Sequence, residues 1–164
     1  MKKVAVIMGS DSDLPIVEKA FAILSDFDIP YEVHIMSAHR TPMDVNYFIS
    51  SAEENGFGVI IACAGMAAHL AGVCASYTTL PVIGVPLKGG AMDGLDSLLS
   101  TVQMPSGIPV ASVAINGAAN AAFLAAEIIA IADGDLSCKL KDYRACAAQK
   151  VREKDANLNK KINS

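Results

Sequence analysis

Apolar residues form two kinds of segment along this chain, short β-branched runs and longer stretches with helical periodicity. The short runs predict strands at residues 4–8, 31–36, 58–63, 81–85 and 109–115. The periodic stretches predict helices at residues 13–27, 42–55, 66–77, 92–101, 118–132 and 136–155. Because the strands are apolar on both faces and alternate with helices, we expect an α/β fold, a three-layer α/β/α sandwich around a parallel sheet.

The number and spacing of these strands fit a flavodoxin-like, five-stranded parallel sheet of order 2-1-3-4-5, and a Rossmann-like order stays open. We expect residues 1–164 to form a single domain with an extended C-terminal helix, because no linker or repeat interrupts the chain. In the flavodoxin-like order the first strand lies between the second and the third. The loops that follow these three strands would then meet at one edge of the sheet, where open α/β sheets bind ligands.

The segment 117–132, "GAANAAFLAAEIIAIA", is apolar on nearly every face, so a helix there needs cover all round. It packs either under the C-terminal helix or, in the interpretation we favour, at an interface between subunits. Composition supports assembly, because charged residues make up 18% of the chain, against about 25% in an ordinary soluble domain. We expect the helix and tail at 136–164 to pack on neighbouring subunits.

Charge is divided unevenly along the chain. Residues 1–138 carry 14 acidic and five basic side chains, whereas residues 139–164 carry three acidic and eight basic ones. An acidic body disfavours nucleic acid as a partner. We interpret the basic segment as a solvated helix rather than a polyanion-binding arm. Arg40 is the single arginine of the first 138 residues.

We expect a cytoplasmic protein that neither spans nor enters a membrane. The longest apolar stretch, 117–132, is shorter than the roughly 20 residues that a span requires. The apolar run after Met1-Lys2-Lys3 is too short for a signal peptide. The four cysteines show no metal-ligand spacing, so we interpret them as reduced, mostly buried thiols, namely Cys63, Cys74, Cys138 and Cys146.

Candidate chemistry gathers in the three loops that follow the first three predicted strands. The loop "GSDSD" at 9–13 has a turn glycine, and the free amides of the next helix would suit a phosphate. The alternative is that its serines and aspartates only cap the helix, without a ligand. The glycine patterns of P-loops and of dinucleotide-binding turns are missing from this loop.

The loop "SAHRTP" at 37–42 is the more informative of the three. It places His39, a side chain that exchanges protons near neutral pH, beside Arg40, a permanent anion anchor. Thr41 and Pro42 predict an N-cap and a first helical turn directly after the pair. A surface pair without a role stays an alternative. In contrast, His34 falls inside a predicted strand, where we expect a structural histidine.

The loop "AGMAAHL" at 64–70 has small residues that would let a ligand approach the backbone. His69 falls in the first turn of the next helix, and its sequence position favours a structural and a functional role equally. The glycine-containing segments 87–94 and 102–109 are candidate lids near the same edge. Sequence motifs of metal sites and of acyl transfer are missing, so we expect no metal and no cofactor. The remaining candidate ligand is an anionic small molecule bound through its phosphate.

Together the segments "VAVIMGSDSD", "SAHRTP", "AGMAAHL", "LPVIGVP", "GLDSLLSTVQMPSGIPVASVAI" and "AANAAFLAAEII" resemble the catalytic subunits of phosphoribosylaminoimidazole carboxylase. The bacterial class I form of this family is N5-carboxyaminoimidazole ribonucleotide mutase. The resemblance implies an isomerase of de novo purine (IMP) biosynthesis that moves a carboxylate from the exocyclic nitrogen to C4 of an aminoimidazole ribonucleotide, by decarboxylation and recarboxylation. It also implies a homo-octamer with sites shared between subunits.

By the same resemblance His39 is the catalytic acid and base, with no cofactor or metal. The matching substrate contacts comprise a phosphate pair, Ser10 and Arg40, a ribose contact, Asp13, and surrounding residues Ser37, Ala64, Gly65, His69 and Leu70.

Three residues depart from the commonest family pattern: Met66 and Met43 replace a glycine and an aspartate, and Ala71 replaces a proline. Met66 adds bulk beside the expected carbon dioxide pocket. Two alternatives stay open, a carboxylase that uses free carbon dioxide and a flavodoxin-like mononucleotide-binding module without catalysis. Arg40 and His69 favour the mutase over the carboxylase.

Overall fold

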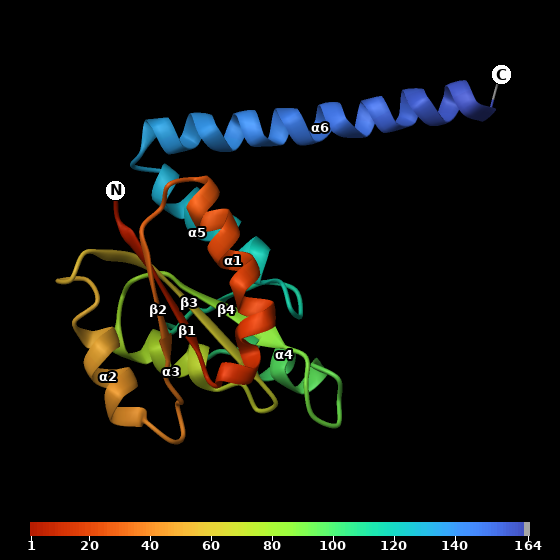
Figure 1. Ribbon diagram of the computed structural model, residues 1–164. Coiled ribbons are helices and arrows are strands. Elements are labelled where there is room, and N and C mark those ends of the chain that lie inside the picture. Colours follow the sequence, from red (N-terminus) through yellow and green to blue (C-terminus); the bar gives the residue numbers. More distant parts are fainter. Residues whose placement is uncertain (163–164) are drawn as a thin grey trace.

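A five-stranded parallel sheet forms the centre of the molecule, whose computed structural model describes residues 1–162 (Figure 1). The sheet order is β2-β1-β3-β4-β5, which confirms the flavodoxin-like arrangement and excludes the Rossmann-like one. The strands are β1 (Lys3–Met8), β2 (Tyr31–Ile35), β3 (Phe57–Gly65), β4 (Val82–Leu87) and β5 (Ala111–Ser112). The three central strands are almost wholly buried, as their apolar runs predicted.

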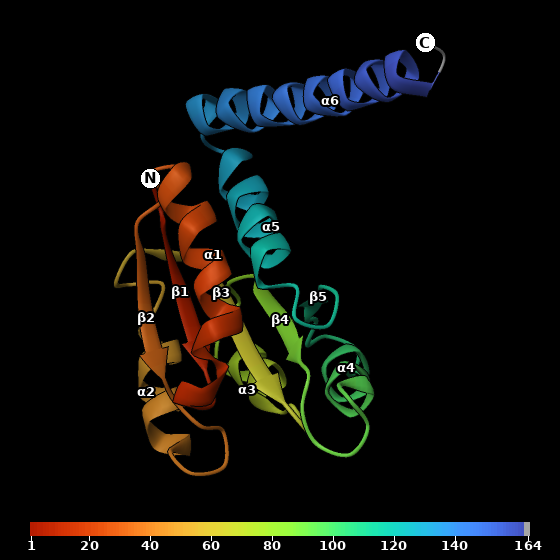
Figure 2. The same cartoon turned by 45° about the vertical axis from the view of Figure 1, so that its right-hand side comes forward.

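Helices cover both faces of the sheet (Figure 2). One face packs against α1 (Leu14–Asp26) and α5 (Ala118–Ala130). The other face packs against α2 (Pro42–Ser50), α3 (Leu70–Tyr77) and α4 (Leu95–Val102). Each face buries its own apolar cluster, so the three-layer sandwich is confirmed.

Several element boundaries differ from the sequence prediction, among them those of the last strand, α2 and α3. The last strand shortens to Ala111–Ser112, and α2 ends at Ser50 instead of residue 55. The third helix begins at Leu70 rather than at residue 66. Met66 accounts for part of this last difference, because its backbone is left-handed with φ 56°, a conformation that keeps residue 66 out of an α-helix.

The alanine-rich face of α5 is buried against α1 and the sheet. Helix α6 (Gly134–Ile162) crosses the end of α5 and buries Leu136 and Leu140 there. The Tyr143 ring of α6 lies 4.9 Å from the Phe123 ring of α5, between ring centroids. The C-terminal helix therefore supplies part of the cover that α5 requires.

Beyond these contacts α6 projects away from the sandwich, and its residues 141–162 are all exposed (Figure 1). The helix extends past the predicted end at residue 155. Residues 163 and 164 of the expected C-terminal tail lie outside the described part of the chain. Within residues 1–162, no helix is both long and apolar enough to cross a membrane.

The cysteines divide into two buried and two exposed thiols. Cys63 and Cys74 are buried, and burial raises the pKa of both, that of Cys74 to about 12. Cys138 and Cys146 are exposed on α6. The prediction of mostly buried thiols is therefore wrong for the second pair, because most of α6 lacks a packing partner within the subunit.

Candidate active site

A cleft of about 780 Å³ opens at the carboxyl edge of the sheet, between the loops that follow β1, β2 and β3. Strand register brings these loops together, because Met8 at the end of β1 pairs with Ile35 of β2 and Cys63 of β3. All nine residues named as site candidates line this cleft: Ser10, Asp13, Ser37, His39, Arg40, Ala64, Gly65, His69 and Leu70.

The first loop holds itself in place through its own side chains. Ser10 caps the short 3₁₀ helix η1 (Asp11–Asp13), and the Ser10 amide donates to Asp13 Oδ2 at 3.2 Å. The Ser12 amide donates to Ser10 Oγ at 3.3 Å and to Asp11 Oδ1 at 3.0 Å. These two amides are thus occupied within the loop, so they do not form the predicted cradle of free amides.

Asp13 turns inward from this loop. Burial raises the pKa of the Asp13 carboxyl above its usual range, against the lowering effects of the Ser10 amide and the nearby Arg40 charge. The carboxyl therefore lies in a half-buried position within the cleft rather than pointing into bulk solvent.

The second loop joins the first through Arg40. The Arg40 Nη2 donates to the Gly9 carbonyl oxygen at 2.7 Å, and its Nε donates to Ser37 Oγ at 3.4 Å. Ser37 Oγ also accepts from the Arg40 amide at 3.2 Å. The guanidinium is held at the cleft wall while its side chain remains exposed, a suitable arrangement for binding an anion.

Thr41 is the N-cap residue of α2 and Pro42 starts its first turn, as predicted. The Thr41 hydroxyl makes no capping bond to the helix, however. It accepts instead from the Ser37 amide at 2.9 Å and so closes the loop that contains His39. The residue thus braces the candidate site in place of capping the helix.

The two cleft histidines are in direct contact. His39 Nε2 lies 2.8 Å from His69 Nδ1, and the two rings meet nearly edge to face. A hydrogen bond between two imidazole nitrogens requires one to donate and the other to accept, so at least one of these nitrogens is unprotonated. The pair can therefore share a proton, and the contact favours the functional interpretation of His69.

Apart from the exposed Met66, the third loop surrounds the histidine pair with small or buried side chains. Ala64 and Gly65 lie at the end of β3, and a Cβ at Gly65 would meet the Leu87 carbonyl oxygen at 3.4 Å. Leu70 is buried at the floor of the cleft and belongs to the core cluster beneath α3. The Ala68 amide donates to Ser100 Oγ of α4 at 2.9 Å, which anchors the loop.

His34 lies apart from the cleft, in β2, where its ring packs 4.5 Å from the Phe48 ring between centroids. Its Nε2 is 3.7 Å from Glu32 and has no hydrogen-bond partner among the described residues. Its place inside β2 agrees with the predicted structural histidine, but the expectation that its ring nitrogens are satisfied is wrong for Nε2.

Sequence reasoning missed Lys88 as a cleft residue. It follows β4, lines the cleft and forms an ion pair with Asp93 at 2.9 Å. Its signal in the sequence was its place in the glycine-containing segment 87–94, three residues after the strand predicted at 81–85. Lys88 adds a second cation to the same edge as Arg40.

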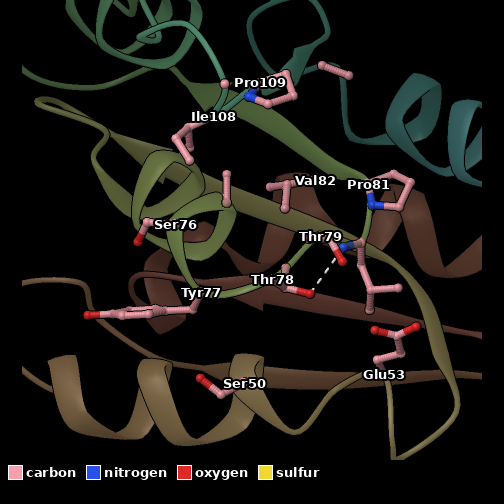
Figure 3. Close-up of a pocket in the computed structure, with 14 residues that line it drawn as sticks. Ser50, Glu53, Ser76, Tyr77, Thr78, Thr79, Pro81, Val82, Ile108 and Pro109 are labelled. Atoms are coloured by element: carbon pink, nitrogen blue, oxygen red, sulfur yellow. Dashed lines mark hydrogen bonds between the residues drawn. The ribbon is translucent and has the colours of Figure 1, made fainter.

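A second hollow, of about 850 Å³, lies at the amino end of β4, away from the histidine pair (Figure 3). Glu53 is its single charged lining residue, and no histidine lines it. Thr78 Oγ1 there accepts from the Leu80 amide at 3.1 Å, and Ser76 Oγ donates to the Val73 carbonyl at 2.7 Å. This hollow has no basic side chain to anchor an anion and no histidine among its lining residues, so the cleft at the carboxyl edge is the better candidate for chemistry.

Within residues 1–162, no three His, Cys, Asp or Glu side chains cluster as a metal site would require. The cleft instead combines a guanidinium, an ammonium, a half-buried carboxyl and a pair of imidazoles. Such a set can bind a phosphorylated ligand and move a proton on it.

Comparison with known proteins places the chain in a family. The family model described as AIR carboxylase matches residues 3–150. A Pyrococcus abyssi protein named N5-carboxyaminoimidazole ribonucleotide mutase is 58% identical over 88% of this chain and 83% of its own length. A Pyrococcus horikoshii protein of the same name is 56% identical over 94% of this chain and 88% of its own length.

A solved structure agrees with these sequence matches. The crystal structure of Treponema denticola PurE superposes with a TM-score of 0.87 at 33% identity and covers 94% of this chain and 97% of that one. Sequence and fold therefore agree over nearly the whole described chain. This chain belongs to the AIR carboxylase family.

Proposed function

We propose that this chain is an N5-carboxyaminoimidazole ribonucleotide mutase of de novo purine (IMP) biosynthesis. The observation that carries the proposal is the direct His39–His69 contact of 2.8 Å beside Arg40, in a chain 58% identical to a protein of that name. The reaction is an isomerisation, in which a carboxylate leaves the exocyclic nitrogen of the imidazole and reappears on ring carbon C4.

His39 acts on both halves of this reaction. As the bond between nitrogen and carboxylate breaks, carbon dioxide is released and a proton on His39 passes to the nitrogen. The electron-rich ring then attacks carbon dioxide through C4, and His39 removes the C4 proton. The proton count closes, so His39 ends in its starting state, and His69 at 2.8 Å holds its ring in place.

The remaining cleft residues bind and enclose the substrate. Arg40 and Ser10 bind the phosphate, to which Lys88 adds a further positive charge, and Asp13 accepts hydrogen bonds from ribose hydroxyls. The small side chains of Ala64 and Gly65, with Ser37 and Leu70, leave room for the imidazole and for carbon dioxide. An aminoimidazole is itself the nucleophile, so this mechanism needs no cofactor or metal.

The functional unit in this proposal is a cytoplasmic homo-oligomer, an octamer by family resemblance. Residues 1–164 form one domain, and α6 packs on neighbouring copies. Support comes from the exposed apolar side chains along the projecting helix, Val151, Leu158 and Ile162. A long helix without a packed face is marginal in water, so a neighbouring copy is the natural partner. The cytoplasmic location rests on the phosphorylated substrate, which does not cross a membrane unaided.

A two-substrate assay tests the proposed reaction. Purified protein receives either N5-carboxyaminoimidazole ribonucleotide or aminoimidazole ribonucleotide with bicarbonate, and formation of 4-carboxy-5-aminoimidazole ribonucleotide is followed. We expect fast turnover of the first substrate. Fast turnover of the second alone would replace the mutase with a carboxylase, the activity that the family description names. Ligand binding without either reaction would indicate a non-catalytic module.

A further inference from the structure

Met66 is the exposed large apolar side chain of the cleft. Of the other large apolar residues that line it, Leu70 is buried in the core and Ile16 is half-buried against the apolar cluster beneath α1. Met66 is 63% exposed. It stands directly after β3 and three residues before His69, so it is attached to the same loop as the histidine pair.

The backbone of Met66 is held in an unusual conformation. Its φ of 56° is left-handed, a region that glycine enters without strain and that a methionine enters only against steric resistance. The loop is nevertheless well anchored on its far side, through the Ala68 amide and Ser100 Oγ. The chain thus has a methionine at a position where glycine would fit the left-handed backbone better.

The side chain of Met66 reaches the loop that follows β4. A Cβ added at Gly90 would lie 3.4 Å from Met66 Cγ, so the methionine rests against the bare backbone of Gly90. Gly90 and its neighbours Lys88 and Gly89 line the same cleft. Met66 therefore links the loop that carries His69 to the loop across the cleft.

We propose that Met66 is a specificity-determining residue, whose side chain forms an apolar wall that retains carbon dioxide between decarboxylation and recarboxylation. This inference rests on the proposed mutase function. Carbon dioxide is uncharged and has no hydrogen-bond donor, so small backbone-lined walls hold it weakly, and entering water would hydrate it to bicarbonate. A polarisable thioether bridging the two loops excludes that water and favours attack by C4 over escape.

Isotope retention tests this role. Substrate labelled with ¹³C in its carboxylate is turned over in unlabelled bicarbonate with carbonic anhydrase, and the label in the product is measured by mass spectrometry. We expect the wild-type protein to retain most of the label. In Met66→Ala and Met66→Gly the ratio of lost to retained label should rise about fivefold or more. A modest lowering of the barrier to escape of carbon dioxide, relative to the barrier to its attack by C4, is enough for this change.

Met66→Leu is the matched control, because it keeps both the apolar bulk and the left-handed backbone demand, and it should retain label like wild type. Met66→Ala keeps the backbone demand without the bulk, so equal leakage from the Ala and Gly variants assigns the effect to the side chain. The partition ratio does not depend on the absolute rate, and circular dichroism confirms folding.

Two results would overturn the inference: label retention in Met66→Ala equal to wild type, or full loss of label from the wild-type protein. The first result leaves the mutase reaction intact. The second would indicate that the product takes its carboxylate from free carbon dioxide, and the two-substrate assay then decides whether the proposed function fails as well, because a mutase turns over the carboxylated substrate without added bicarbonate.

Discussion

At the scale of single residues, three cleft side chains have contacts that indicate a distinct role for each. His39 contacts a second imidazole, Arg40 is tied to the Gly9 carbonyl, and Asp13 is half-buried beneath both loops. The contacts of His39 and Arg40 join segments that lie about 30 positions apart in the chain. Asp13 is turned away from bulk solvent. Substitutions at the three positions should therefore separate chemistry, binding and folding.

His39→Asn should abolish turnover and retain substrate binding, because the anion anchors remain while the proton carrier is lost. We expect turnover to fall about 10²-fold to 10⁴-fold, the usual contribution of a general acid or base. Steady-state kinetics and calorimetric binding measure the two effects. The control is His34→Gln, a histidine outside the cleft, which should turn over normally. Normal turnover by His39→Asn at saturating substrate would contradict the proton-transfer role.

Arg40→Ala should mainly weaken binding of the phosphorylated substrate. The loss of a charged hydrogen-bonding partner predicts an affinity lower by about tenfold to a hundredfold. Isothermal titration compares this variant with Lys19→Ala, which removes a cation from the exposed face of α1. Undiminished affinity for substrate in Arg40→Ala would remove Arg40 from the phosphate site.

Asp13→Asn should change stability in a pH-dependent way. Since burial raises the pKa of Asp13, folding favours its protonated form, and the penalty for ionising it grows as pH rises through the folded-state value. Asparagine can still accept from the Ser10 amide and carries no charge. We expect the variant to melt at a higher temperature than wild type at pH 7. This difference in melting temperature should shrink as the pH is lowered towards 3.8, the ordinary pKa of an aspartate. An advantage that grows in acid would contradict the assigned direction.

At the scale of elements, β4 and α4 pack at unusually close range through Gly84. A Cβ there would lie 2.3 Å from Thr101 Cγ2 and 3.0 Å from Val110 Cγ1. One buried hydroxyl reinforces the contact, since Ser97 Oγ of α4 donates to the Leu87 carbonyl of β4 at 2.9 Å. Thr101 Oγ1 donates within α4, to the Ser97 carbonyl at 2.7 Å. This packing positions the start of the loop that faces Met66.

Gly84→Ala should lower the free energy of unfolding by about 1–3 kcal/mol, because the added methyl overpacks the contact with α4. Urea denaturation measures the change. Thr101→Ser removes the clashing methyl, so Gly84→Ala with Thr101→Ser should recover part of the loss. Gly134→Ala is the control, since nothing lies within 4 Å of a Cβ there. Equal stability of Gly84→Ala and wild type would show that α4 can shift freely.

At the scale of the whole molecule, the sandwich and the projecting helix differ in what supports them. The sandwich buries two apolar clusters of its own, whereas α6 is exposed from residue 141 onward. Two ion pairs, Lys139 with Asp28 and Arg144 with Glu127, hold only the first turns of α6. The rest of the helix is suited to contacts between copies.

Val151→Asp combined with Leu158→Asp should reduce the assembly to smaller species, because charges replace the apolar side chains offered to a neighbour. Light scattering measures the molar mass, and circular dichroism should show that the sandwich persists. Asn159→Asp adds charge beside Leu158 without removing an apolar group, and it should leave the assembly intact. An unchanged mass in the double variant would exclude this part of α6 from the subunit contacts.

Much of the molecule could be predicted from local patterns. Alternation of apolar runs with periodic segments indicated the layers, and the polar residues directly after the first three strands indicated the cleft. These features are local, because strand and helix periods are set by neighbouring residues. Boundaries failed where a local exception intervened, as with the left-handed Met66, which contributes to the late start of α3 at Leu70.

The kinds of elements, their order and the residues at the strand ends follow from local sequence, because apolar periodicity and turn chemistry depend on adjacent residues. Long-range contacts instead depend on the folded chain: His39 meets His69, Arg40 reaches Gly9, Lys88 joins the cleft and Met66 lies against Gly90. These contacts join residues some 24 to 31 positions apart. Strand register and loop conformation bring them together, and both depend on the packing of the whole sheet.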